Sequence, residues 1–257
     1  SLGFAFSLPK DGSDLNPRFR GLNPDENDHV TYAQKIKETG GLVRFPAKEI
    51  KAARDAKQPE SEELRAYAET HQPPLYYVVG AILGGGLTAL RVLSALIGLA
   101  TVALAYRAAR DILPEFLDAA WGAAGLMACL PAAAQLSGAA NNDPLTTLVC
   151  TGIFWRLGLL VRNGLTLRDA LVLAAWLGAG LWTKLTVLQL FPLVVIGAFL
   201  PLPNPSPGRS SLTERGASET PPPSATKERP GEGAGGRGKT LLYTAMALAV
   251  ALLIASP

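Results

Sequence analysis

Charged residues are scarce over long stretches of this 257-residue chain, although they make up 18% of the whole. Four segments hold at most one charge each, namely 87–106 (Arg91), 121–140, 144–155 and 170–200 (Lys184). A surface helix of a soluble domain shows a polar face every third or fourth residue, and these segments do not. Because about 20 apolar residues in a helix cross a bilayer core, the shortage of charge excludes an ordinary soluble domain and indicates membrane spans.

Cysteines and basic clusters are scarce as well. The two cysteines, Cys129 and Cys150, both lie within apolar segments, where a small buried side chain is a better interpretation than a disulfide or a metal pair. The net charge is only +3, and no basic cluster alternates with aromatic residues. We therefore expect no nucleic-acid partner, and we expect membrane lipids to surround the chain.

The order of polar and apolar segments predicts an all-α fold, a polytopic transmembrane helix bundle with a long external first loop that carries short interfacial helices. We expect five parts: the tail of a truncated first span (1–6), the external loop (7–86), transmembrane helices (87–200), a disordered cytoplasmic linker rich in Pro and Gly (201–239), and the start of a further truncated span (240–257). The chain begins without Met and ends in an apolar run, so we interpret it as a fragment of a larger protein.

Three short helices are predicted in the external loop. One runs from about Asp25 to Thr39, opened by "NPDE" and closed by two glycines. A second runs from about Ser61 to Thr70. The third lies within "HQPPLYYVVGAIL", His71 to Leu83, which is too short to span a membrane and whose tyrosine pair suits the interface. The spans are expected at about 87–106, 116–136, 145–161, 170–182 and 185–200, of which the last two are short for a full crossing.

The short loops set the expected orientation. One side of the predicted bundle holds the linker and a group of arginines (Arg107, Arg110, Arg156, Arg162 and Arg168). The other side holds "SGAANND", without a basic residue, and Lys184. By the positive-inside rule the first side is cytoplasmic, and a long opening loop is translocated regardless of its charge. The acidic stretch at 25–29 is therefore expected outside.

Three acids and a histidine lie within residues 25–29. A transferase that moves a group from a lipid carrier needs a carboxylate to deprotonate the acceptor and polar or cationic groups to hold the carrier phosphate as it leaves. Asp25 and Glu26 can provide the first, and Arg91 and Lys184 the second, since an ionisable residue at membrane depth is a functional hypothesis by default. Two simpler interpretations carry equal weight: Arg91 snorkels to the interface, and the acids only complement a helix dipole.

Five motifs resemble segments of the GT-C glycosyltransferases of the protein mannosyltransferase type, in the order of that family: "PDENDHVTYAQKIKETG", "HQPPLYYVVGAIL", "LRVLSALIGLATVALAYRAAR", "LSGAANNDPL" and "GLWTKLTVLQLFPL". The resemblance extends over about Asn23 to Leu193. It implies a GT-C-like bundle that takes a mannose-like sugar from a polyprenyl-phosphate carrier and transfers it with inversion to a protein, lipid or polysaccharide acceptor. The implied site faces the outside, and we expect a bacterial plasma membrane with the site on its periplasmic face.

The same resemblance assigns roles to single residues. Asp25 matches the catalytic base and Glu26 its acidic neighbour, while Arg91 matches the arginine that holds the carrier phosphate. Four further residues match positions that line the site: His29, His71, Asn142 and Asp143.

No cofactor is predicted. Asp25 and His29 are four residues apart on one helix face, and some relatives in the superfamily use a divalent cation, which leaves room for one here. Because no spacing is diagnostic of a metal, we interpret His29 as a hydrogen-bonding partner in the site. Two other functions stay open: a polytopic transporter or flippase, whose charges should lie near mid-membrane on interrupted helices, and a non-catalytic membrane protein of the same fold.

Overall fold

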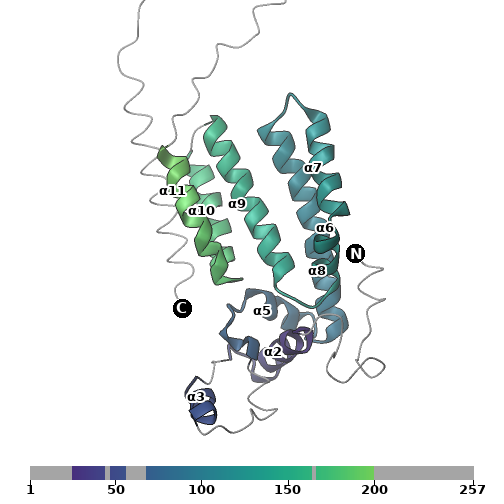
Figure 1. Cartoon of the computed structure of the whole chain (residues 1–257), viewed down its shortest axis with the longest axis vertical. Helices are drawn as coiled ribbons and strands as arrows, with labels where there is room; N and C mark the ends of the chain where they lie inside the picture. The colour runs from purple at the N-terminus through teal and green to yellow at the C-terminus, as the bar shows by residue number, and fades with distance from the viewer. Residues whose placement is uncertain (1–24, 44–46, 56–67, 164–165, 200–257) are drawn as a thin grey trace, which may run out of the picture.

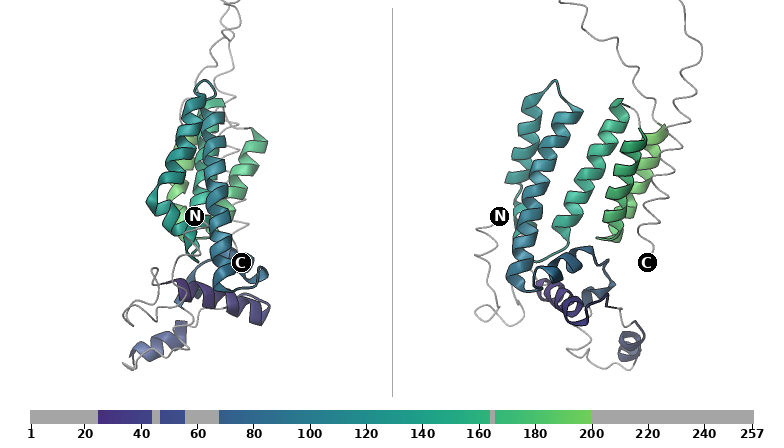
Figure 2. Two further views of the ribbon diagram at one scale, coloured as in Figure 1. Left: turned by 90° about the vertical axis from the view of Figure 1, so that its right-hand side faces the viewer. Right: turned by 180° about the vertical axis from the view of Figure 1, so that it is seen from behind.

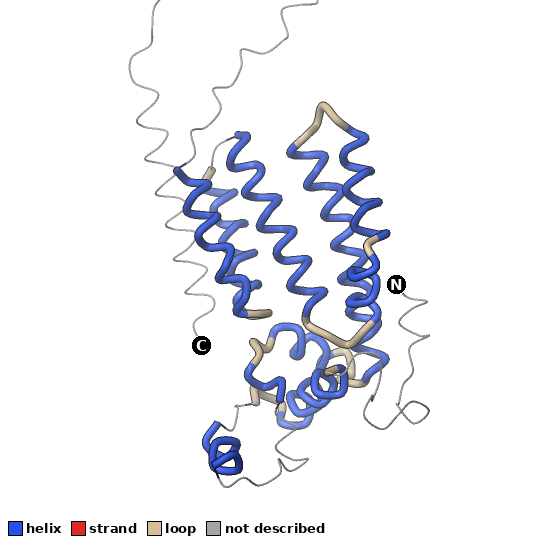
Figure 3. Tube along the Cα trace, in the orientation of Figure 1, coloured by secondary structure: helices blue, strands red, loops and turns tan. Residues whose placement is uncertain are grey.

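The computed structural model describes residues 25–43, 47–55, 68–163 and 166–199. In these segments all regular secondary structure is helical (Figure 3), as the sequence predicts. The elements are α2 (Glu26–Thr39), α3 (Ala47–Asp55), η1 (Ala68–His71), α5 (Leu75–Ile82), α6 (Leu87–Ile112), α7 (Leu117–Cys129), α8 (Pro131–Gly138), α9 (Asp143–Asn163), α10 (Leu167–Leu181), η2 (Leu185–Leu190) and α11 (Phe191–Phe199).

The helices from α6 to α11 run side by side as a bundle, and α2 and α5 lie together at one end of it (Figure 1). Along the chain, α6 leads away from that end, α7 and α8 return, α9 leads away, α10 returns, and α11 leads away again. The two further views in Figure 2 show the same arrangement. The loops at 139–142 and 182–184 therefore both reach the end that carries α2.

Two helices, α6 and α9, are long and apolar enough to cross a membrane, and α7 with α8 makes a third if the bent pair is one span. Their surfaces agree with this assignment. Large apolar side chains point outward from the bundle, among them Leu99 at 65%, Trp121 at 65% and Leu126 at 72% exposure. Such a surface promotes aggregation in water, whereas in a bilayer it contacts the acyl chains.

The span predicted at about 116–136 is not one straight helix, because α7 and α8 meet at an angle of 58°. Leu130, between them, has the extended dihedrals φ −69° and ψ 115°. The next residue is Pro131, whose ring disfavours the α conformation at the residue before it and which has no N–H for the helix ladder. Pro131 is instead the first residue of α8, where a missing N–H is harmless.

The first predicted helix is α2, which begins and ends as expected. Glu26 and Asp28 lie in its first turn and Lys37 in its last, so their charges complement the helix dipole. Gly40 follows in the left-handed conformation, with φ 65°, and its N–H donates to the carbonyl of Ile36 at 3.0 Å.

The other parts of the opening loop agree with the prediction only in part. The helix predicted within His71 to Leu83 is α5 (Leu75–Ile82), which starts directly after the two prolines. Of the helix predicted at about Ser61–Thr70, the residues before 68 lie outside the described segments, and 68–71 form the 3₁₀ turn η1. The sequence did not predict α3. The segments predicted at 1–6, 201–239 and 240–257 lie outside the described residues.

A buried apolar cluster fixes α2 and α5 to the bundle. It contains Tyr32 and Ala33 of α2, Tyr76 and Tyr77 of α5, and Leu90 of α6. The chain passes from α5 to α6 through a tight turn that contains Gly84 and Gly85, at φ 115° and 72°, a region that residues with a side chain rarely adopt. This turn places the first turns of α6 directly against α2.

Candidate functional site

The structure places all the predicted site residues at the α2 end of the bundle. They come from five elements that are distant in the sequence: α2, η1, the first turns of α6, the loop leading into α9, and the loop after α10. Several of these residues lie close enough to His29 for their charges to act on its imidazole, namely Asp25, Asp143, Lys184 and Glu26.

Glu26 and Arg91 form a buried ion pair. The Arg91 guanidinium donates from Nε to Oε1 of Glu26 at 2.8 Å and from Nη2 to Oε2 at 2.7 Å. The backbone N–H of Ala140 also donates to Oε1, at 2.7 Å. Glu26 is 5% exposed and Arg91 3%. This bidentate geometry is the strong form of the interaction, and it binds α2 to α6 and to the loop at 139–142.

Tyr76 of α5 also connects α6 with the loop at 139–142. Its hydroxyl donates to the carbonyl of Leu90 at 3.2 Å, contacts Oγ of Ser94 at 2.8 Å, and accepts the backbone N–H of Asn141 at 3.2 Å. The ring is fully buried. Burial therefore raises the pKa of Tyr76 well above its ordinary value, so this hydroxyl stays protonated and serves as a fixed hydrogen-bonding group.

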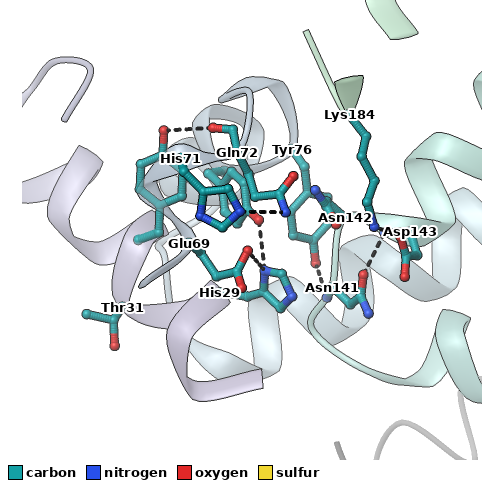
Figure 4. Close-up of polar contacts among 12 residues, drawn as sticks. His29, Thr31, Glu69, His71, Gln72, Tyr76, Asn141, Asn142, Asp143 and Lys184 are labelled. Atoms are coloured by element: carbon teal, nitrogen blue, oxygen red, sulfur yellow. Dashed lines mark hydrogen bonds and ion pairs between the residues drawn. The ribbon is translucent and has the colours of Figure 1, made fainter. Parts of the chain in front are cut away.

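The loop before α9 meets the loop after α10 through the predicted residues Asn142, Asp143 and Lys184 (Figure 4). The Asn142 amide donates to the carbonyl of Thr183 at 3.3 Å. The Lys184 ammonium donates to Oδ1 of Asp143 at 2.5 Å. The two side chains are 27% and 32% exposed, so this ion pair borders solvent, unlike the one between Glu26 and Arg91.

His29 lies among aromatic rings and is 5% exposed. Its Nδ1 is 2.8 Å from the hydroxyl of Tyr77, and the two rings stack with centroids 5.7 Å apart. Burial lowers the pKa of His29 to about 4, although the negative charges of Asp25 and Asp143 oppose that shift. At neutral pH His29 is therefore an uncharged hydrogen-bonding partner. Within the described segments, no three His, Cys, Asp or Glu side chains gather to hold a metal ion.

Asp25 and His71 lie on the outer side of this network. Asp25 precedes α2 as its N-cap residue, and its side chain makes no capping hydrogen bond. Asp25 is exposed, yet its charge acts on the buried His29 and on the partly buried Glu69. His71 is also exposed, and its Nε2 lies 3.3 Å from the side-chain amide of Gln72. Asp25 is thus a carboxylate that a molecule arriving from solvent can reach.

The sequence prediction missed several residues that build the site. Tyr76 and Tyr77 were expected only as interfacial aromatics, and their hydrogen bonds connect α5 with α6 and α2. Glu69 lies near His29. It was not predicted as a site residue, because the sequence shows it only as one of many acids in a charged loop. The two tyrosines could have been suspected, because a tyrosine that is buried usually carries its hydroxyl to a polar partner.

One comparison with known proteins decides the family. The family model described as dolichyl-phosphate-mannose-protein mannosyltransferase matches residues 72–215, more than half of the chain. The chain belongs to this family. The match confirms the resemblance found in the sequence and identifies a membrane glycosyltransferase, in agreement with the apolar helices. The matched range of this mannosyltransferase family member includes Arg91, Asn142, Asp143 and Lys184. Helix α2 lies before the matched range. Neither the curated proteins nor the solved structures gave a match.

Proposed function

We propose that the chain carries the donor-side part of a transferase site. The enzyme takes a mannose-like sugar from a polyprenyl-phosphate carrier and transfers it, with inversion, to a protein, lipid or polysaccharide acceptor. Catalysis takes place at the external face of a bacterial plasma membrane. That the chain belongs to a membrane glycosyltransferase follows from the family. The donor, the acceptor and the face of the membrane are our proposal.

The exposed carboxylate of Asp25, beside a rigid buried network, carries this proposal. The ion pair of the neighbouring Glu26 with Arg91 holds the start of α2 against the bundle, and Asp25 itself remains accessible. A general base needs both a fixed position and access to the proton that it removes. Asp25 is therefore assigned as the general base and Glu26 as the residue that positions it.

In the reaction, an acceptor hydroxyl attacks the anomeric carbon of the sugar while Asp25 takes the hydroxyl proton. The new glycosidic bond forms as the bond from that carbon to the phosphate oxygen breaks on the opposite face, and the carrier leaves as polyprenyl phosphate. Lys184 stabilises the leaving phosphate, because its ammonium has three donors and Asp143 is the partner of one.

The sequence predicts Arg91 as a phosphate-binding residue too. In the structure its Nε and Nη2 both donate to Glu26, and the side chain is 3% exposed. Lys184 is 27% exposed and is the better placed of the two cations to reach a phosphate. We therefore propose that the main role of Arg91 is to support α2. Its contact with the carrier phosphate remains a prediction.

The position of the site favours the external face and a transferase rather than a transporter. Arg110, Arg162 and Arg168 lie at the end of the bundle opposite α2, as the topology of α6, α9 and α10 requires. The positive-inside rule assigns that end to the cytoplasm. The acids of the site cluster at the other end rather than half-way along the spans, where a transporter would hold its substrate.

The substitution Asp25→Asn tests the mechanism. It should lower transfer of labelled mannose from polyprenyl-phosphate mannose by about 10²- to 10⁴-fold, the usual contribution of a general base. The fold should persist, because the exposed side chain of Asp25 makes no capping hydrogen bond and Asn has nearly the same shape. The matched control is Glu38→Gln, on the exposed end of α2, which should transfer normally. Wild-type turnover by Asp25→Asn would refute the role of Asp25.

A further inference from the structure

Glu69 has a carboxylate oxygen with unmet hydrogen-bonding capacity. Among the described residues, its Oε2 is buried and has no hydrogen-bond partner, and its side chain is only 14% exposed. Native proteins rarely leave a buried acceptor unsatisfied, because desolvation then has no compensation. A buried acceptor of this kind beside a candidate site is available to a hydrogen-bond donor on a bound substrate.

The residues around Glu69 do not supply that partner. Nδ1 of His29 is 3.8 Å from Oε2 (Figure 4), which is too far for a hydrogen bond. The same nitrogen is 2.8 Å from the hydroxyl of Tyr77. Burial keeps His29 neutral and raises the pKa of Glu69. The charged groups whose fields reach Glu69 come from three elements: Asp25 and Asp28 repel its negative charge, and His71 and Lys184 attract it.

We propose that Oε2 of Glu69 accepts a hydrogen bond from a hydroxyl of the donor sugar and so selects a carrier that bears the sugar over the bare carrier. This inference rests on the proposed function. An ionised carboxylate only accepts hydrogen bonds, and a sugar presents several O–H donors. Lys184, to which we assign the carrier phosphate, acts on Glu69 through its charge, so the two groups belong to one neighbourhood. The acceptor substrate approaches from the exposed side, where Asp25 lies.

The test compares two ligands, polyprenyl-phosphate mannose and bare polyprenyl phosphate, bound by the full-length protein in detergent. The wild type should bind the mannosylated carrier more tightly. Glu69→Leu, of similar size and without an acceptor, should lose about 10-fold to 100-fold of that preference, the value of a hydrogen bond to a charged group. Its affinity for the bare carrier should not change. Glu69→Gln keeps an acceptor oxygen and should retain part of the preference.

Stability separates a binding role from a structural one. Glu69→Leu removes an unsatisfied buried acceptor, so its unfolding temperature should equal or exceed that of the wild type, whereas loss of a structural contact would lower it. Deoxymannose carriers identify the hydroxyl: removing the one that Glu69 binds should weaken wild-type binding and leave Glu69→Leu unaffected. Glu38→Leu, exposed on α2, is the control and should behave as the wild type.

The outcomes also separate this inference from the proposed function. If the wild type binds neither carrier, the proposed function is wrong and the role of Glu69 with it. If the wild type prefers the mannosylated carrier and Glu69→Leu keeps that preference, the function stands and the assignment of Glu69 is wrong. The assignment also fails if Glu69→Leu weakens both ligands equally, or if only the KM for the acceptor rises.

Discussion

Single residues at the α2 end of the bundle divide into those that hold the site and those that can react. Glu26 and Arg91 belong to the first class, because both are almost fully buried and are bonded to each other. Two buried charges are tolerated only as a pair, and removing one leaves the other without compensation. Asp25, next in the chain to Glu26, is exposed and belongs to the second class.

This division predicts a strong coupling between Glu26 and Arg91. Each single substitution, Glu26→Gln or Arg91→Met, should lower the free energy of unfolding by about 3–5 kcal/mol, since it breaks a buried bidentate ion pair. The double variant should be less destabilised than the sum of the two single variants. Denaturation of all four proteins in detergent gives the coupling energy as a double-mutant cycle. Additive losses would show that the ion pair contributes nothing specific.

At the scale of elements, small residues and a proline decide how the spans meet. Pro131 divides one apolar segment into α7 and α8, which a count of hydrophobic residues cannot reveal. Gly152 of α9 faces the indole of Trp176 on α10, and a Cβ at Gly152 would lie 2.5 Å from ring carbons of that indole. Close approach at small residues is a common way for membrane helices to pack.

Substitution of Gly152 tests this contact. Gly152→Ala should destabilise the protein by about 1–3 kcal/mol, because the added methyl overpacks the interface of α9 and α10. The matched control is Gly125→Ala on α7, where a Cβ meets no atom within 4 Å. This control should be neutral or gain up to about 1 kcal/mol from better helix propensity. Equal thermal stability of the two variants would contradict the packing that the structure shows.

For the whole molecule, the ends of the bundle differ in chemistry. One end carries α2, α5 and the acidic site, and the other carries Arg110 and Arg162. Each end should therefore face a different side of the membrane, with the arginines in the cytoplasm. This orientation decides which substrates reach Asp25.

Cysteine labelling measures the orientation directly. In a background with Cys129→Ser and Cys150→Ala, a membrane-impermeant maleimide should label Glu38→Cys in intact cells. Arg110→Cys should react only after the membrane is permeabilised. Both positions are exposed in the structure, so burial does not limit either reaction. The reverse pattern would place the site in the cytoplasm and refute the external location.

Most of the helical fold could be predicted from the sequence, because the signals are local. Length and hydrophobicity identify α6 and α9, and the acids and glycines at the ends of α2 mark its limits. The kink at Pro131 was missed because the hydrophobic pattern runs through it without a break. The 3₁₀ turn η1 was missed because it lies in a uniformly polar loop.

The sequence by itself determined the class of the molecule and the identity of the reactive candidates, because composition and residue type are properties of the chain alone. The tertiary structure decided their partners. The bonds of Arg91 with Glu26 and of Lys184 with Asp143 each join residues at least 40 positions apart, and so does the contact between His29 and Tyr77. Which acid is buried in an ion pair and which stays accessible depends on those long-range contacts, and no local pattern encodes them.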